Sequence, residues 1–182
     1  MGAHFTVTVD KGQCDTELNA LRYQFQPLEE SLCEIAAHWT SIFPHIGPPL
    51  EPWRDATELG RTPSDLFYMP GGFTLSCGSS AFRLHHVSRI DAFISDHTTR
   101  VLLRNFSRRL CSVLATNFAL YSPCEGVGDE IAAAVSEGLS VGDIERRFRQ
   151  LGDPPSPISQ LGSMAWPRRR YHIDRFEDLS PT

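Results

Sequence analysis

Three arginines recur at four-residue steps in the middle of the chain. Arg100, Arg104 and Arg108, here called the arginine row, lie on one face of any helix that contains them. Adjacent like charges at this spacing repel by about 0.2–0.5 kcal/mol per pair. A nearby anion would relieve this repulsion: a phosphate, an acidic face of a partner protein, or carboxylates of the same chain. Alternatively, the row is simply a solvated face of the helix. The candidates in this chain are Glu29, Glu30 and Glu34.

Two further features have the composition of protein-interaction surfaces. Trp53 lies in a proline-rich stretch, and Arg168, Arg169 and Arg170 follow one another near the end of the sequence. Tryptophan and arginine are frequent anchors of protein interfaces. We therefore predict that a protein partner contacts Trp53, the arginine row and the three consecutive arginines.

The cysteines predict free thiols. They are odd in number, widely spaced and contain no CxxC pair, unlike a disulfide framework or a structural zinc site. We expect most of them to be small core residues in a reducing compartment. The five are Cys14, Cys33, Cys77, Cys111 and Cys124.

A cysteine nucleophile is the main catalytic alternative. Cys77 or Cys124 would need a base and an orienting acid such as Asp96. No flanking signature of a cysteine protease accompanies either cysteine. The candidate bases are His85, His86 and His97.

Metal chemistry is not indicated by the histidine spacing. His85 and His86 are neighbours in a predicted strand, so their side chains point to opposite faces of the sheet. The chain also lacks the HxH, HxxxH and HExxH spacings. We expect no metal and no cofactor, and the sequence identifies no small-molecule ligand.

The segment 127–151 resembles a helix-turn-helix. Gly138 separates two short helical patterns, and Ser140 with Asp143 forms a capping box with aspartate in place of glutamate. Asp143 and Glu145 would put carboxylates where a recognition helix meets phosphates. We therefore expect a helix hairpin packed on the core, with nucleic-acid binding unlikely.

The remaining patterns predict an α+β fold in one domain, 1–182. Apolar and polar residues alternate over residues 4–9, which predicts a half-buried strand. Residues 66–87 predict a small antiparallel β-meander that packs against several helices. Asp96 caps a helix that extends to about Ala115. A proline-rich loop, 43–65, interrupts the chain, and an irregular tail, 153–182, follows the hairpin.

Composition and charge narrow the class of protein. The chain has 182 residues and a net charge of −5, which argues against a nucleic-acid binder. Residues 1–60 carry nine acidic and three basic side chains, whereas residues 61–122 carry seven basic and three acidic ones, which favours internal pairing. No apolar run is long enough for a membrane span, and no secretory signal is expected, so we predict a soluble cytoplasmic protein.

The catalytic patterns are all incomplete, so the sequence favours a non-enzymatic function. We expect an accessory, regulatory or inhibitory protein that binds another protein. One alternative is an enzyme with an unrecognised pocket and a cysteine nucleophile. The other is a helix-turn-helix protein that binds nucleic acid or a peptide.

Overall fold

A computed structural model describes residues 4–12, 14, 18–42, 54–55, 66–69, 72–161 and 169–179. Strands and helices alternate in groups along the chain, as expected for an α+β protein. The strands are β1 (His4–Asp10), β2 (Arg54–Asp55), β3 (Leu66–Met69), β4 (Phe73–Cys77), β5 (Ala81–Arg89), β6 (Phe118–Pro123) and β7 (His172–Arg175). The α-helices are α1 (Leu18–Phe25), α2 (Glu29–Ile42), α3 (Ile90–Ser95), α4 (His97–Val113), α5 (Val127–Ser136) and α6 (Val141–Gln150), and the 3-10 helices are η1 (Gln26–Leu28) and η4 (Ile158–Gln160).

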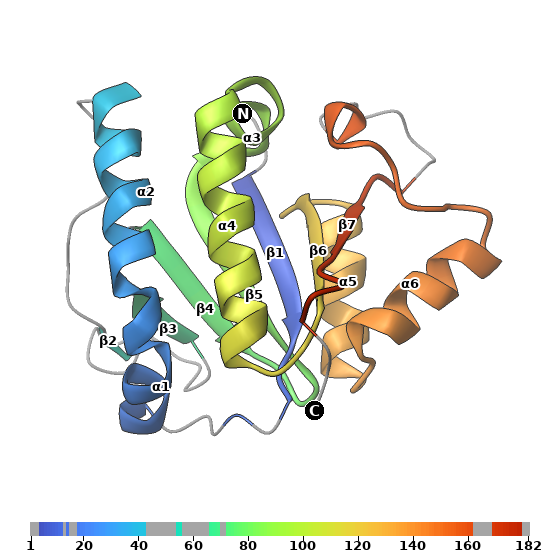
Figure 1. The fold of residues 1–182 in the computed structure, drawn as a ribbon. Helices are drawn as coiled ribbons and strands as arrows, with labels where there is room; N and C mark the ends of the chain where they lie inside the picture. The colour runs from blue at the N-terminus through green and yellow to red at the C-terminus, as the bar shows by residue number, and fades with distance from the viewer. Residues whose placement is uncertain are drawn as a thin grey trace.

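The described strands form one antiparallel sheet in the order β2-β3-β4-β5-β1-β6-β7. β1 lies inside the sheet, with Val7 opposite Leu84 of β5 and Tyr121 of β6 (Figure 1). The predicted meander, β3 to β5, is therefore only part of the sheet. β1, β6 and β7 join it through partners that are distant in sequence.

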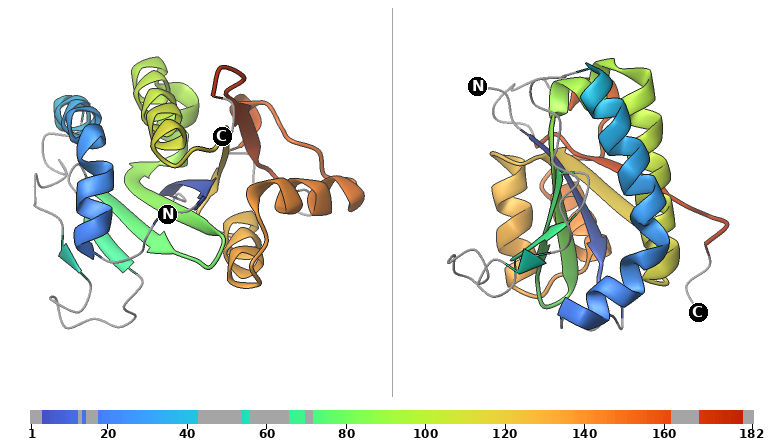
Figure 2. Two further views of the ribbon diagram at one scale, coloured as in Figure 1. Left: turned by 60° about the horizontal axis from the view of Figure 1, so that its bottom comes forward. Right: turned by 90° about the vertical axis from the view of Figure 1, so that its left-hand side faces the viewer.

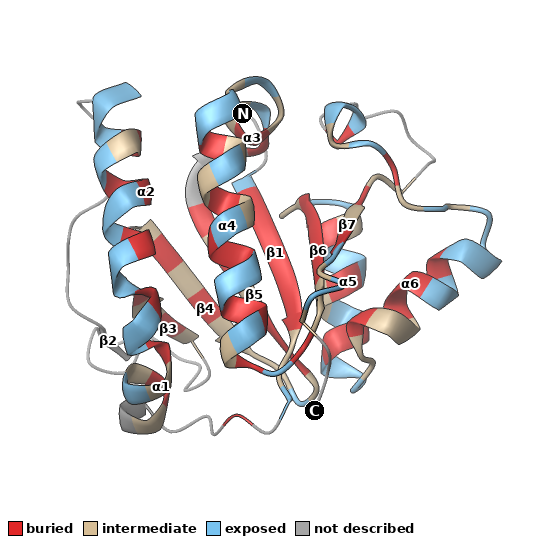
Figure 3. Ribbon diagram, in the orientation of Figure 1, coloured by how far each residue is buried: buried red, intermediate tan, exposed pale blue. Residues whose placement is uncertain are grey.

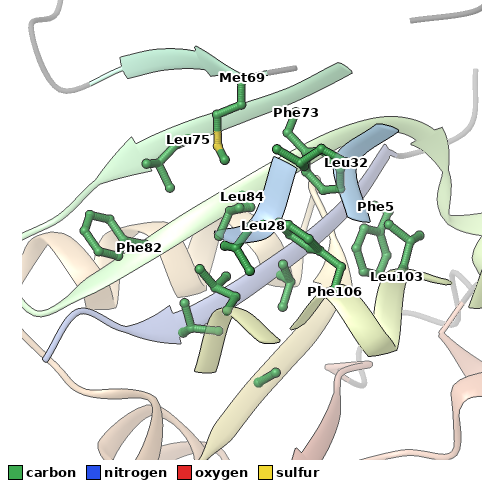
Figure 4. Close-up of a cluster of buried hydrophobic side chains, with 14 of the residues drawn as sticks. Phe5, Leu28, Leu32, Met69, Phe73, Leu75, Phe82, Leu84, Leu103 and Phe106 are labelled. Carbon is green, nitrogen blue, oxygen red and sulfur yellow. The ribbon is translucent and has the colours of Figure 1, made fainter. Parts of the chain in front are cut away.

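Different helices cover the two faces of this sheet. Figure 2 shows α5 on the opposite side of the sheet from α2 and α4. The alternating residues Phe5, Val7 and Val9 are fully buried on the α4 side, where they belong to the main apolar cluster (Figure 4). Leu120 and Ile131 belong to a second cluster under α5 and α6. Burial of each large apolar side chain contributes about 1.5–3 kcal/mol, so both layers are needed for stability.

The apolar stripe of α4 faces the sheet. Leu103, Phe106 and Leu110 are fully buried, and the outer surface of the helix is exposed (Figure 3). Asp96 caps α4 as predicted, because its carboxylate accepts a 2.6 Å hydrogen bond from the backbone N–H of Thr99. The arginine row therefore points away from the core.

Pro27 separates two helices. It lies in η1, between α1 and α2, because proline cannot supply the backbone N–H that a continuous α-helix needs. Leu28 and Leu32 continue the buried side of this helical segment.

The predicted hairpin is formed by α5 and α6. The Ser140 hydroxyl accepts a hydrogen bond from the backbone N–H of Asp143 (3.2 Å), which completes the capping box. Val141 and Ile144 are fully buried, and Glu145 is only 6% exposed. The first turn of α6 therefore faces the protein's own core, which argues against contact with base edges.

The structure corrects the prediction of an irregular tail at 153–182. Residues His172–Arg175 form β7, in which Asp174 lies opposite Ala119 of β6. The sequence signal for this strand is weak because it is short and its buried Asp174 is charged. Within the predicted loop 43–65, Arg54–Asp55 forms β2, and the remainder, including Trp53, lies outside the described residues.

Candidate functional site

The arginine row lines a hollow on the outer surface of α4. Its volume is about 220 Å³, and we call it the α4 hollow. Most of its lining comes from successive turns of α4, and one residue comes from the segment after β7. The lining residues are His97, Arg100, Val101, Arg104, Asn105, Arg108 and Phe176.

The central arginine is bound to a buried carboxylate. Arg104 donates two hydrogen bonds to Asp174, from Nε (2.6 Å) and from an Nη (2.5 Å). The Asp174 side chain is 8% exposed, and the Arg104 side chain is 43% exposed. This bidentate geometry fixes the position of Arg104 in the lining of the hollow.

A histidine and a tyrosine complete the surroundings of this pair. His172 contacts Asp174 through Nε2 (3.2 Å) and the carbonyl of Ser156 through Nδ1 (2.9 Å). Both ring nitrogens face acceptors, so a protonated ring can donate to both. Tyr121 is fully buried, and its ring centroid lies 5.9 Å from that of His172. The network positions Arg104 and ties β7 to α4.

The carboxylate of Asp174 is held in its charged form. Burial raises the pKa of Asp174, but hydrogen bonds from His172 and Arg104, with the charge of Arg104, hold it at about 2. The pair therefore stays ionised over the whole neutral and mildly acidic range.

Stability is expected to fall in acid through this group. The folded pKa of about 2 lies below the unfolded value of about 3.9, so the contribution is complete above about pH 4 and is lost toward pH 2. We expect this loss to be about 2–3 kcal/mol. Urea unfolding at several pH values should show a shallower acid decline for Asp174→Asn than for the native protein. Equal declines would contradict the assignment, since both proteins share their other carboxylates.

The two outer arginines are held more loosely. Arg108 pairs with Asp178, and both side chains are more than half exposed. Arg100 donates from Nη1 to the carbonyl of Ile94 (2.7 Å), and among the described residues it has no carboxylate partner. Exposed ion pairs contribute little stability, so ligands can compete for these guanidinium groups.

The predicted counterions of the row need correction. Arg104 binds Asp174, and Arg108 binds Asp178. Both aspartates lie near the end of the chain, in β7 and in the segment after it. Glu30 lies 3.7 Å from Arg109, which is outside the row. Among the described residues, Asp174 and Asp178, rather than Glu29, Glu30 and Glu34, therefore neutralise Arg104 and Arg108.

Arg169 and Arg170 border a different hollow, of about 350 Å³, beside Pro154 and Pro157. Arg169 is paired with Glu130 (2.6 Å) and Asp153 (2.7 Å). Arg170 donates to the side-chain amide oxygen of Gln160 (2.8 Å). The predicted interaction residues are therefore not brought into one site, and Arg168, like Trp53, lies outside the described residues.

The thiols occupy three kinds of environment. Cys14 and Cys111 are buried, Cys77 and Cys124 are half-buried against the core, and Cys33 is exposed on α2. Four of the five therefore lie in or against the core, in agreement with the expectation that most would do so. Burial raises the pKa of Cys111 to about 12, so this thiol stays protonated.

The proposed catalytic partners bind other groups. Cys124 accepts a hydrogen bond from the backbone N–H of His4 (3.2 Å). His85 contacts the hydroxyl of Thr6 (3.1 Å), and Asp96 pairs with His38 (3.0 Å). His86 is buried on the opposite face, against Phe73. These contacts give no support to a cysteine triad.

The described residues contain no group of three or more side chains that could ligate a metal ion. None of their helices combines the length and apolar character needed to cross a membrane. Comparison with protein-family models, curated proteins and solved structures found no match. The functional argument therefore depends on the geometry of the chain itself.

Proposed function

We propose that this protein is a non-enzymatic binding protein whose α4 hollow holds an acidic segment of a partner protein. The observation that supports this proposal is that carboxylates of the same chain already bind two arginines of the row. Asp174 binds Arg104 in a bidentate manner, and Asp178 binds Arg108. The same surface therefore has the geometry to bind carboxylates of another chain.

The hollow offers separate places for fixed and exchangeable contacts. Arg104 is rigid because Asp174 holds it, whereas Arg100 has no carboxylate partner among the described residues. Val101 is 40% exposed and, with Phe176, adds apolar surface beside the charges. This mixture suits an acidic peptide with an apolar side chain better than an isolated inorganic anion.

The overall charge favours a protein partner over nucleic acid. The net charge of −5 would repel a polyanion outside the hollow. Asp174 and Asp178 also reduce the positive charge within it. A short acidic segment that contacts only Arg100 and Arg108 avoids most of this repulsion.

Peptide binding tests the proposal directly. A fluorescent peptide of glutamate and alanine with one leucine should bind, and its affinity should fall with added salt. Arg100→Gln should weaken binding about tenfold, because one charge-assisted contact contributes about 1–2 kcal/mol. Asp178→Asn should strengthen binding because an internal competitor is removed. Fluorescence anisotropy over a salt series measures all three effects.

The matched control is Arg146→Gln. Arg146 is an exposed arginine on α6 and pairs with Asp143. Its replacement removes the same charge but leaves the α4 hollow intact. If Arg100→Gln and Arg146→Gln weaken peptide affinity equally, binding depends only on the overall charge of the protein, and the proposed site is refuted. Tighter binding of a single-stranded oligonucleotide than of the peptide would assign the hollow to nucleic acid instead.

A further inference from the structure

The segment between α6 and η4 contains three prolines, in the sequence Asp153-Pro154-Pro155-Ser156-Pro157. A proline ring fixes φ at about −65°, and the residue before a proline is biased toward extended values of ψ. The segment is therefore restricted to the polyproline II conformation, except at ψ of Pro155 and φ of Ser156. Residues 153–157 belong to no helix or strand, and Pro157 has φ −55° and ψ 147°, as polyproline II requires.

Hydrogen bonds hold this segment against the edge of the sheet, beside β7 (Figure 1). The backbone N–H of Ser156 donates to the carbonyl of Tyr171 (2.7 Å), and Nδ1 of His172 donates to the carbonyl of Ser156 (2.9 Å). The hydroxyl of Tyr171 donates to the carbonyl of Asp153 (2.9 Å). The segment is thus fixed at the residue that the prolines leave free, so a partner that binds it loses little conformational entropy.

Pro154 and Pro157 form an exposed edge of the segment. Polyproline II has three residues per turn, so residues three positions apart lie on the same edge. Pro154 and Pro157 are both exposed, whereas Pro155 is half-buried and Ser156 is 8% exposed. The chain therefore turns Ser156 toward its own sheet and presents the two prolines of a PxxP pattern to solvent.

The hollow of about 350 Å³ described above borders this edge. Pro154, Pro157 and Arg170 are among its lining residues, none of which is aromatic. Arg170 donates to the side-chain oxygen of Gln160 (2.8 Å) and has no carboxylate partner among the described residues. Aromatic rings pack on proline rings and on guanidinium groups. The hollow is therefore suited to an aromatic side chain of another protein, with a carboxylate of that protein beside Arg170.

We propose that segment 153–157 is the binding surface for a protein domain whose aromatic-lined groove recognises polyproline II. Such grooves take prolines at the PxxP spacing, and the segment already has the required conformation before binding. An acidic side chain at the rim of the groove pairs with Arg170. The lining of this surface shares no residue with the α4 hollow, so the inference is independent of the proposed function.

An array of purified SH3 and WW domains tests the proposal, because these domains bind polyproline II through aromatic-lined grooves. The full chain of 182 residues would be applied at several concentrations. We expect saturable binding to at least one domain, and a proline-rich peptide that occupies the groove of that domain should displace the protein. Absence of binding to every domain, or binding that the peptide does not displace, would overturn the proposal.

Proline substitutions locate the contact on the segment. Pro154→Ala and Pro157→Ala should each weaken binding about tenfold, because each removes one ring from the exposed edge. The matched control is Pro155→Ala, which relaxes the same backbone but removes a ring from a different edge, so its affinity should change less than about twofold. Equal losses for the three variants would show that the exposed edge is not the contact. Unfolding midpoints in urea should stay close to that of the native protein for all three.

Arg170→Gln tests the same surface with every proline retained. The variant should weaken binding several-fold and reduce its dependence on salt, because one ion pair with the partner is lost. Unchanged affinity and salt dependence would contradict the position of the partner beside Arg170. Arg100→Gln should leave domain binding unchanged, and Pro157→Ala should leave binding of the acidic peptide to the α4 hollow unchanged. Loss of domain binding in Arg100→Gln would place the contact in the α4 hollow and overturn this inference alone.

Discussion

Arg104→Glu is expected to lower the free energy of unfolding by about 3 kcal/mol, the lower end of the range for breaking a buried ion pair. The substitution leaves Asp174 buried without its bidentate partner and adds a second carboxylate beside it. The cost stays at the lower end because the side chain of Arg104 is 43% exposed. Urea unfolding of the variant and the native protein measures the difference.

Arg108→Glu is the control for this prediction. Arg108 is one turn further along α4, and both it and its partner Asp178 are more than half exposed. Water screens this pair, so its loss should change the unfolding midpoint only slightly. Similar destabilisation by both variants would show that the exposed pair contributes as much as the buried one, so that burial of Asp174 does not set the cost.

Gly128→Ala is expected to destabilise the protein by about 2–3 kcal/mol. A Cβ atom at this position would lie 2.2 Å from the carbonyl oxygen of Pro123, which belongs to the backbone of β6. Because the backbone cannot rotate away as a side chain does, α5 must shift from the sheet. Thermal or urea unfolding monitored by circular dichroism would record the loss.

Gly142→Ala provides the opposite sign. Gly142 lies in the first turn of α6, and the nearest heavy atom to its added Cβ would be the hydroxyl oxygen of Ser140, at 3.9 Å. Alanine has a higher helix propensity than glycine, so this variant should gain about 0.5–1 kcal/mol. Stabilisation by both variants would mean that α5 does not pack on Pro123 as closely as the structure indicates.

Helices α4 and α6 were well determined by local sequence patterns. The three- and four-residue recurrence of Leu103, Phe106 and Leu110 predicts the buried side of α4, and Asp96 predicts its start. Ser140 and Asp143 likewise predict the beginning of α6. These signals involve residues within one or two turns of each other, so they can be read without knowledge of the tertiary structure.

The candidate binding surface was only partly predictable. Helical spacing places Arg100, Arg104 and Arg108 on one face, and the structure confirms this placement in the α4 hollow. Their counterions were not predictable because Asp174 and Asp178 follow Arg104 and Arg108 by seventy residues. Contacts across the sheet depend on strand register in the same way, since Thr8 and Arg83 meet only when β1 pairs with β5.

The sequence by itself determined the α+β class, the helices α4, α5 and α6, and the alternating faces of β1. Those features depend on side-chain periodicity and on capping residues that act within a few positions. Tertiary structure alone decided that β1 lies between β5 and β6, that β7 joins the sheet, and which carboxylates neutralise the arginine row. Antiparallel strands of similar pattern can pair in several orders, and a buried charge such as Asp174 becomes favourable only after its distant partners have been placed.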